Sequence, residues 1–382
     1  GTPSLTTARD LLAQWLREAG MDVRLDAVGD LRGRFAGSGP SAPALLMGSH
    51  FDSVRDAGRY DGPLGILVAI EAVDRLRATG IRAPFPIDVI AFADEEGVRF
   101  QTTYLGSCAL AGTFDPAFLD LADADGVTLR EAMAAFGGNP DDLAGAALRP
   151  GDAFAYVEVH IEQGPYLESV NAPVGVVTAI SGQTRILVSF IGEAGHAGTV
   201  AMHLRRDPLP AAAECVLAAE QLARRTPGLL ATVGVFDAQP GASNVIPGAV
   251  NFSLDVRHPR DAVRTNAVDS LEKRAGEIAA TRALELHWRV ARDHPAVPCD
   301  PALVARLADA VAATGRPVER LPSGAGHDAM VMSAVVPVAM LFVRCAGGIS
   351  HNPAESVDAA DVAVAIDVVD RFLDALASEG PS

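Results

Sequence analysis

Two adjacent carboxylates, Glu95 and Glu96, could supply a metal ligand and a proton acceptor side by side. They follow the apolar stretch Ile87–Phe92, which is typical of a buried strand, and Gly97 then allows a sharp turn. Open α/β sheets bind their ligands beyond the carboxyl ends of the strands. Because neighbouring side chains on an extended chain point in different directions, one glutamate can bind a metal while the other faces a water. The alternative is that both acids only charge the N-terminus of the next helix.

Imidazole and carboxylate groups follow a second apolar stretch. His50 and Asp52 come directly after residues 44–48, and Asp61 lies in a glycine-flanked turn nine residues beyond Asp52. Neutral imidazole nitrogens and carboxylate oxygens suit zinc or manganese. Asp52 lies on the same side of an extended chain as His50 and could fix the tautomer of that imidazole. A single histidine at a strand end is, however, more often a hydrogen-bonded structural residue.

Two further histidines lie at comparable positions. His160 ends the alternating stretch 155–160, and His351 follows a glycine pair and precedes Pro353. Chance can place one such side chain at a strand end, but it is a poor explanation for three or four. The pattern therefore predicts that these side chains meet at one edge of a sheet.

The composition limits the class of protein. The chain has 382 residues, enough for two domains, and 49% of them are hydrophobic and 21% charged. A net charge of −17 argues against nucleic acid and membrane as partners, so an anionic substrate needs local arginine or lysine. We recognise no signal peptide and no bilayer-spanning apolar stretch, and expect a cytoplasmic protein with its scattered cysteines reduced. A targeting segment before Gly1 stays an open alternative.

The order of elements changes in the middle of the chain. Between residues 183 and 294 the predicted order is βαββαβ, which is that of a ferredoxin-like unit. We therefore predict an α/β protein with two domains. Residues 1–182 and 295–382 form a catalytic domain with a mixed sheet flanked by helices, and residues 183–294 form the inserted domain.

Two predicted elements are less regular than the rest. Residues 115–147 are expected to be helical, with a break at Gly137-Gly138, and residues 230–236 are expected to form one strand of the inserted domain.

The inserted domain carries polar groups of its own. His196 lies between glycines, Asn244 lies in a short polar turn, and Arg257 directly follows the predicted strand 250–256. Such groups could form a lid that holds an anion. The alternative is that they serve only the loops and strand ends of the domain itself.

Eight motifs together resemble the metal-dependent amidohydrolases of the M20 type. They occur in the order of that family over nearly the whole chain: GSHFDS, YDGPLG, DEEGVRF, VEVHIEQGP, GHAGT, SNVIP, SGAGHDA and GGISHNPAE. Within the family, the chain is most similar to the branch of allantoate amidohydrolases and N-carbamoyl-L-amino-acid hydrolases. The stretches RDAGRYDGPLG, DEEGVRFQTTYLGS, GQTR and MLFVRCAGGISH, the last with Arg344, are closer to the allantoate amidohydrolases. One departure is Ala201, where the family usually has proline.

The resemblance implies two divalent metal ions per chain, with manganese favoured over zinc. The implied ligands are His50 and His160 for one ion, Glu96 and His351 for the other, and Asp61 for both. The ions would activate a water molecule and polarise the scissile carbonyl. Glu95 would take the proton of that water and pass it to the leaving nitrogen.

The resemblance also implies a small anionic ureido acid as substrate. The implied contacts are a carboxylate held by Arg257 and Asn244, ureido groups oriented by Gln163, Arg205 and His327, and an oxyanion bound by His196. The favoured reaction converts allantoate to ureidoglycine, ammonia and carbon dioxide. N-carbamoyl-L-amino-acid hydrolysis is the alternative on the same scaffold. A non-catalytic dimeric binding protein is the alternative from another class, although it would not need Glu95.

The inserted domain is also the expected dimerisation domain. Its two helices would cover one face of the sheet and leave strand edges free to pair with another chain. The resemblance likewise implies a homodimer through this domain, in which His196 acts in the active site of the partner subunit.

Overall fold

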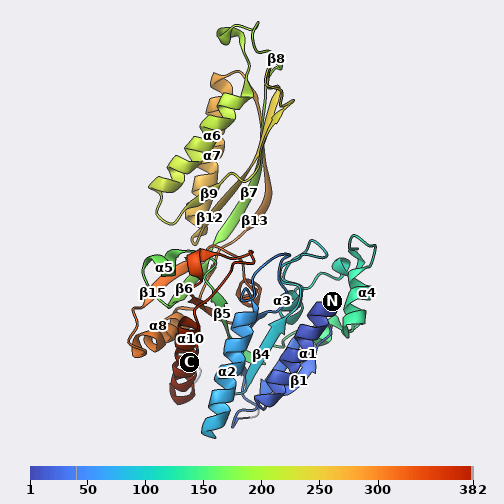
Figure 1. The fold of residues 1–382 in the computed structure, drawn as a ribbon, viewed down its shortest axis with the longest axis vertical. Coiled ribbons are helices and arrows are strands. Elements are labelled where there is room, and N and C mark those ends of the chain that lie inside the picture. Colours follow the sequence, from blue (N-terminus) through green and yellow to red (C-terminus); the bar gives the residue numbers. More distant parts are fainter. Residues whose placement is uncertain (40, 380–382) are drawn as a thin grey trace. The chain divides into compact units, whose positions relative to one another are not determined.

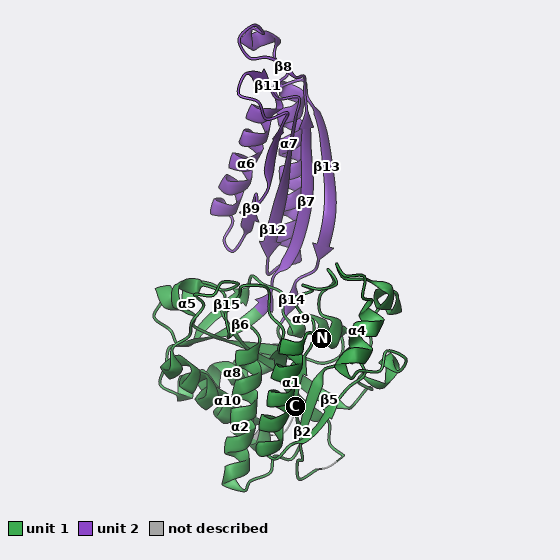
Figure 2. Ribbon diagram, turned by 45° about the vertical axis from the view of Figure 1, so that its right-hand side comes forward, with its two compact units in different colours: residues 1–178, 299–382 green, residues 179–298 purple. Residues whose placement is uncertain are grey.

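The computed structural model describes residues 1–39 and 41–379, and the chain divides into two compact units (Figure 1). Unit 1 comprises residues 1–178 and 299–382, and unit 2 comprises residues 179–298 (Figure 2). These boundaries lie a few residues outside those expected at 182/183 and 294/295. The reason is that both connections run through the antiparallel pair of β6 (Val174–Ile180) and β14 (Val297–Pro298).

Nine strands of the described residues form one mixed sheet, which belongs to unit 1 except for β14 and the last two residues of β6. Their spatial order is β1 (Asp22–Leu25), β2 (Leu31–Phe35), β4 (Ile87–Phe92), β3 (Ala44–His50), β5 (Ala153–Ile161), β16 (Val338–Val343), β6 and β14, and β15 (Glu319–Ser323) pairs with β6. Neighbours within the central run β4-β3-β5-β16 are parallel, so their carboxyl ends lie at one edge. β3, β4 and β16 are buried throughout, as expected of parallel strands covered on both faces.

Helices cover both faces of this sheet. The larger layer consists of α1 (Pro3–Glu18), α2 (Pro63–Thr79), α8 (Pro301–Ala313) and α10 (Ala359–Glu379), which share one hydrophobic core with Leu45, Met47, Val157 and Leu341. Since strand side chains alternate between faces, His50, Glu158 and His160 point to the other face. There α9 (Asp328–Met332) packs against β5 and β16, and α3 (Leu105–Leu110) packs against β4. A further short helix, α5 (Tyr166–Ser169), follows β5.

The segment 115–147 is largely not α-helical, so that prediction was wrong. It contains the 3₁₀ turns η1 (Pro116–Asp120) and η2 (Leu143–Gly145), and α4 (Leu129–Phe136) is its α-helix. A capping box of Thr128 and Glu131 begins α4, and Gly137 in the left-handed region ends it after eight residues. These strong local stop signals outweigh the apolar periodicity.

Unit 2 has the predicted βαββαβ order, except that the second strand is divided into two short strands. Its elements in chain order are β7 (Gly182–Ile191), α6 (Pro208–Arg225), β9 (Leu230–Thr232), β10 (Phe236–Gln239), β12 (Ala249–His258), α7 (Asp261–Thr281) and β13 (Glu285–His294). The antiparallel sheet has the order β10-β12-β7-β13, with β9 also paired to β12. The expected strand 230–236 is thus divided into β9 and β10. Alternate side chains of β7 and β12 pack under α6 and α7 in a core of their own.

Short elements complete the described chain. They are the ribbon of β8 (Gly195–His196) and β11 (Val245–Ile246) and the 3₁₀ turns η3 (Met202–Leu204) and η4 (Ala346–Gly348). Within the described residues, no helix combines the length and apolar character needed to cross a membrane.

Candidate metal centre

The carboxyl ends of β3 and β5 bring His50 and His160 together on one face of the sheet. Their Nε2 atoms lie 3.4 Å apart. Nδ1 of His50 lies 3.0 Å from the backbone carbonyl of Asp52, and Nδ1 of His160 lies 2.9 Å from that of Ile161. Because a carbonyl oxygen only accepts, each Nδ1 carries a proton, and in the neutral ring Nε2 keeps its lone pair. Both rings are therefore oriented as ligands for one cation.

Asp61 lies between three imidazoles. Its Oδ1 is 3.1 Å from Nε2 of His160 and 3.8 Å from Nε2 of His50. Its Oδ2 is 3.0 Å from Nε2 of His351. The Asp61 side chain is 2% exposed. The next residue, Gly62, is the N-cap of α2, and a Cβ added there would lie 2.4 Å from the His50 ring. One buried carboxylate can thus serve two cations, one at each oxygen.

The second group consists of Asp61, Glu96 and His351. Oε1 of Glu96 lies 3.5 Å from Nε2 of His351. This oxygen is buried and has no hydrogen-bond partner within the described residues, although buried carboxylate oxygens are normally paired. The candidate ligand atoms of each group, the first made of His50, Asp61 and His160, lie within 4.8 Å of one another. The unpartnered oxygen and the donor set both fit divalent cations.

Glu95 lies next to these groups. It is 8% exposed and has a ligand-type oxygen within 4.8 Å of those of His50 and Glu96. It follows Asp94, whose φ of 55° places the chain in the left-handed region. Non-glycine residues rarely adopt this conformation, and such strain concentrates at functional sites.

Asp52 contacts the His50 ring, as predicted, but through its backbone carbonyl and not through its carboxylate. Its carboxylate lies 3.8 Å from Nδ1 of His50, and its backbone carbonyl is the actual partner of that ring. Instead, Oδ1 accepts the backbone N–H of Glu95 at 3.0 Å, and Oδ2 accepts that of Glu96 at 3.1 Å. The turn after β4 points two consecutive N–H groups at one place, where a carboxylate is the matching acceptor. Asp52 therefore fixes the turn that carries both glutamates.

The pKa values reflect the crowding of carboxylates. Burial, together with the charges of Asp328 and Glu96, raises the pKa of Glu95 well above its usual value. Burial and the nearby Asp61 raise the pKa of Glu96 to about 7. A carboxyl group in such surroundings keeps its proton unless a cation replaces it.

The pKa values of His160 and His50 shift in opposite directions. Burial opposes the charge on His160, but its hydrogen bond to Asp61 outweighs this and raises the pKa of His160 to about 9. Burial and the neighbouring His160 lower the pKa of His50 to about 4. Burial also opposes the charge on Asp61, but its hydrogen bonds with His160 and His351 hold the pKa of Asp61 well below its usual value. The Asp61 carboxylate thus stays charged, while His160 holds a proton that a cation would have to displace.

Gln163 and His327 both adjoin this cluster, in different ways. Nε2 of Gln163 donates to Oδ2 of Asp61 at 3.0 Å, and its Oε1 is buried without a hydrogen-bond partner in the described part of the chain. His327 is 1% exposed. Its Nε2 lies 2.8 Å from Oγ of Ser323, and its ring centroid lies 4.5 Å from that of His160. Gln163 therefore has a free acceptor beside Asp61, whereas His327 makes interior contacts.

His196, Asn244 and Arg205 gather at one end of unit 2. β8 and β11 pair His196 with Val245. The N–H of Ala197 donates to the carbonyl of Asn244 at 3.0 Å, and Nη2 of Arg205 donates to the carbonyl of Ala197 at 2.7 Å. His196 and Asn244 are exposed. These three predicted residues thus belong to one loop cluster.

Arg257 lies at the opposite end of the same sheet. It faces Gln183 across the β7–β12 pair, whereas β8 and β11 continue from the other end, at Ala249 (Figure 2). The eight residue steps between 249 and 257 span about 26 Å of strand. The Arg257 guanidinium binds the carboxylate of Asp255 at 2.8 and 3.1 Å. Within one chain, Arg257 and Asn244 therefore lie far apart, and their predicted binding of one substrate carboxylate stays a prediction.

Two side chains at the cluster were missed by the sequence analysis. Oγ of Ser350 lies 3.1 Å from Oδ2 of Asp61. Glu158 accepts hydrogen bonds from Oγ of Ser49 at 2.9 Å and from the N–H of Ala329 at 3.0 Å. Strand alternation could have found Glu158, because it lies two residues before His160 and so on the same face.

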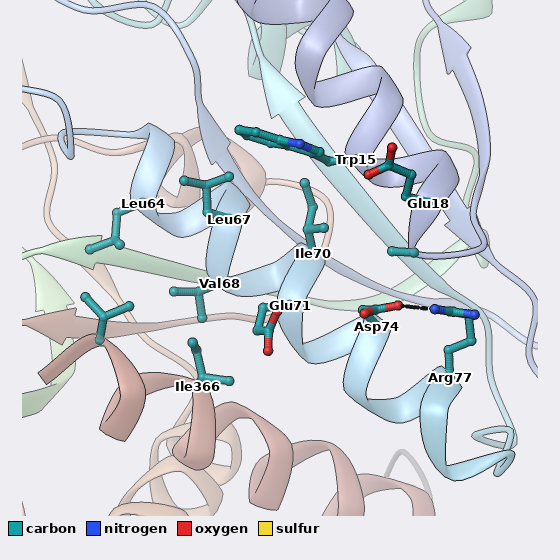
Figure 3. A pocket seen from close by; sticks show the side chains of 12 residues that line it. Trp15, Glu18, Leu64, Leu67, Val68, Ile70, Glu71, Asp74, Arg77 and Ile366 are labelled. Atoms are coloured by element: carbon teal, nitrogen blue, oxygen red, sulfur yellow. Dashed lines mark hydrogen bonds and ion pairs between the residues drawn. The ribbon is translucent and has the colours of Figure 1, made fainter. Parts of the chain in front are cut away.

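A groove of about 620 Å³ lies in the helical layer on the other face of the sheet. It runs between α1, α2 and α10, and Trp15, Leu67 and Ile366 are among its lining residues (Figure 3). An ion pair of Asp74 and Arg77 lies at its border. Its described lining contains none of the predicted site residues. The candidate active site is therefore the cluster at the strand ends and not this groove.

The fold and the two groups that share Asp61 define the chain as an α/β protein with a candidate dinuclear metal centre. Residues 44–375 match Peptidase family M20/M25/M40, and the chain belongs to this family. The family is metal-dependent and hydrolytic, so the predicted enzyme class, a metal-dependent hydrolase, is confirmed.

Named relatives are similar over most of their length. The chain is 43% identical over 362 residues to the N-carbamoyl-L-amino acid amidohydrolase of Geobacillus stearothermophilus, covering 95% of this chain and 88% of the relative. It is 42% identical over 406 residues to a probable allantoate deiminase of Oryza sativa subsp. japonica, covering 98% and 83%. Its fold is similar to a crystal structure of an amidase of the hydantoinase/carbamoylase family from Burkholderia multivorans, with a TM-score of 0.93, 36% identity, and coverage of 98% and 90%.

Proposed function

We propose that this hydrolase cleaves a linear ureide or amide C–N bond of a small acid, with allantoate as the favoured substrate. The observation that carries the proposal is the convergence of two candidate metal groups on Asp61 beside the buried Glu95. The products would be ureidoglycine, ammonia and carbon dioxide. Relatives named allantoate deiminase, at 40–42% identity, support this choice.

The second candidate is hydrolysis of N-carbamoyl-L-amino acids. The relative from Geobacillus stearothermophilus carries that name at 43% identity, so identity alone does not separate the two activities. Arg344, which the sequence analysis connected with the allantoate branch, forms a two-point ion pair with Asp361 at 2.7 and 2.9 Å. Its guanidinium therefore has a partner within its own chain.

Two divalent ions would be held by the groups that share Asp61. His50 and His160 would complete one site, and Glu96 and His351 the other. Bound ions would lower the pKa of a water molecule and polarise the scissile carbonyl. Nitrogen and oxygen ligands of this kind suit manganese and zinc, and we favour manganese.

Glu95 would move the proton. Its carboxylate would accept a proton from the attacking water and return it to the leaving nitrogen. The hydrogen bonds from the turn to Asp52 hold the backbone of Glu95, so the carboxylate keeps its direction. Gln163, with its unpartnered Oε1 beside Asp61, could accept a hydrogen bond from an N–H group of a ureido substrate.

Unit 2 would supply groups to two different active sites of a homodimer. Arg257 would hold the substrate carboxylate, and His196 with Asn244 would reach the active site of the partner subunit. Their separation along β12 supports this division, because one carboxylate cannot contact both ends of the strand. β13 is an edge strand with mostly exposed residues, which suits pairing between subunits.

Ammonia release tests the substrate assignment. Manganese-loaded protein would be assayed with allantoate, several N-carbamoyl-L-amino acids and a neutral urea of similar size. We expect the highest kcat/KM for allantoate and little turnover of the neutral urea. A higher kcat/KM for an N-carbamoyl-L-amino acid would favour the second candidate, and binding of allantoate without turnover would favour a binding protein.

A further inference from the structure

Glu355 joins the two loops that carry Asp61 and His351. Its side chain is 5% exposed. Its Oε1 accepts the backbone N–H of Tyr60 at 2.8 Å and that of Asp61 at 3.2 Å. Its Oε2 lies 3.1 Å from Oγ of Ser350, the residue that precedes His351. One carboxylate therefore connects the loop before α2 with the loop after β16.

The loop before α2 is closed tightly around this carboxylate. A Cβ added to Gly58 would lie 2.1 Å from Oε1 and 2.3 Å from Cβ of Glu355. A side chain at position 58 would therefore displace Glu355 from its place. The backbone of residues 58–61 therefore packs directly against the Glu355 side chain, and this packing requires glycine at position 58.

The hydroxyl of Ser350 has one proton and two acceptors within reach. Its Oγ lies 3.1 Å from Oδ2 of Asp61 and 3.1 Å from Oε2 of Glu355. A hydroxyl donates only one hydrogen bond. When the proton points to Glu355, Oδ2 of Asp61 keeps a lone pair for a cation. When it points to Asp61, that lone pair is occupied.

We infer that Glu355 is a positioning residue for the candidate metal centre. It holds the backbone of Asp61 and accepts the proton of Ser350, so that Oδ2 of Asp61 is available to the cation of Glu96 and His351. Both oxygens of Glu355 already face hydrogen-bond donors, so Glu355 is not itself a ligand. The inference rests on the two-ion site of the proposed function.

Metal affinity is the direct test. Manganese binding to metal-free protein would be measured by calorimetry for the wild type, Glu355→Ala and Glu355→Gln. The alanine variant loses all three hydrogen bonds, and we expect one of the two ions to bind about 10–100-fold less tightly. In the glutamine variant, the carbonyl oxygen can still accept the backbone N–H groups. Its amide N–H would, however, donate to Ser350 and turn the serine proton towards Asp61, so we expect an intermediate loss of about 3–10-fold.

A matched control separates this effect from a loss of general stability. Asp300 lies in the same unit and also accepts two backbone N–H groups, those of Ala302 at 2.9 Å and Leu303 at 3.0 Å, at the start of α8. Asp300→Ala should lower the Tm, as the loss of a helix cap does, and leave both manganese affinities unchanged.

The outcomes distinguish the inference from the proposed function. Two ions in the wild type, with less than a three-fold loss of affinity in both Glu355 variants, would overturn the inference and leave the proposed function standing. A wild type that binds no divalent ion would overturn both. If Glu355→Ala does not fold, Glu355→Gln decides alone, and a loss of three-fold or more supports the inference.

Discussion

Glu95 and Glu96 are adjacent in the chain, but their carboxylates have different surroundings. Glu96 lies near Asp61 and His351, where its unpartnered oxygen can bind a cation. Glu95 is more deeply buried, and this burial, followed by the charge of Asp328, raises its pKa. The alternation of side-chain directions along the chain separates the two roles.

Replacing each glutamate by glutamine should give opposite results. Glu95→Gln keeps the size but removes the proton acceptor, so kcat should fall by at least ~10²-fold while both ions stay bound. Glu96→Gln should instead weaken one ion. Steady-state kinetics and manganese titration check both, with Glu319→Gln, a carboxylate of β15 at the edge of the same sheet, as the control. Metal loss in Glu95→Gln alone would mean that the two roles are reversed.

Metal affinity should depend steeply on pH. His160, with a pKa of about 9, and Glu96, with a pKa of about 7, hold protons that a metal must displace. Below these values the metal-free protein is protonated, so affinity should rise with pH. We expect about a ten-fold gain per unit between pH 7 and 8 and a steeper gain below pH 7, where both groups release protons. Calorimetry in metal-buffered solutions checks this, and a flat profile from pH 6 to 8 would contradict it.

The strand ends and the turns after them hold these side chains in place. β3, β4 and β5 are parallel neighbours, so the residues after them meet at one edge without any long loop. The turn after β4 is held by Asp52, which accepts two successive N–H groups. The geometry of Glu95 therefore depends on a residue from another strand end.

Asp52→Asn should loosen this turn. The amide offers one acceptor and places an N–H group against a backbone N–H, so we expect a loss of about 1–3 kcal/mol in the free energy of unfolding. The kcat should fall as well, because Glu95 loses its fixed direction. Urea unfolding and steady-state kinetics check this. Asp115→Asn, an exposed cap of η1 that accepts one N–H group, is the control, and an Asp52 variant indistinguishable from it would contradict the assignment.

Replacing Arg257 tests whether this end of unit 2 binds the substrate carboxylate. A charge-assisted hydrogen bond to a buried carboxylate contributes roughly 1.5–3 kcal/mol, so Arg257→Ala should raise the KM for allantoate by about ten-fold or more. Asp255 holds this guanidinium, and Arg185 contacts the same carboxylate at 3.2 Å. Arg185→Ala is therefore a matched control that should change KM much less. An unchanged KM in Arg257→Ala would exclude it from binding the substrate carboxylate.

At the scale of the whole molecule, the proposed homodimer explains why unit 2 has polar residues at two separate ends. Arg257 faces Gln183, one residue after the start of β7, close to where the chain enters unit 2. His196 lies at the far end of the same strand pair, in the exposed loop of β8. This separation within unit 2 is what the proposal requires, because it assigns Arg257 and His196 to different active sites.

Mixed dimers test this arrangement. His196→Ala and Glu95→Gln would each be inactive alone. In a co-expressed mixed dimer, the chain with intact Glu95 receives an intact His196 from its partner, so one of two sites is whole. Activity should return to at most about half of the wild type if the sites are independent. The two homodimers mixed after purification are the control, and a co-expressed sample that stays inactive would show that His196 serves its own chain.

The local sequence pattern by itself determined the main strands and the residue types of the candidate metal site. The apolar stretches before His50 and Glu95 and up to His160 are strands in the structure, and the element order of unit 2 is as predicted. The reason is that buried parallel strands are continuous apolar runs, and that such strands deliver the residues after them to a common edge. The residue types themselves then indicate a metal site.

Only the tertiary structure decided which atoms meet. The partner of His50 is a carbonyl and not the Asp52 carboxylate, Arg257 and Asn244 lie at opposite ends of one strand pair, and Glu355 reaches residues almost 300 positions away. Strand register and loop packing set these contacts, and both depend on long-range burial that no local pattern encodes.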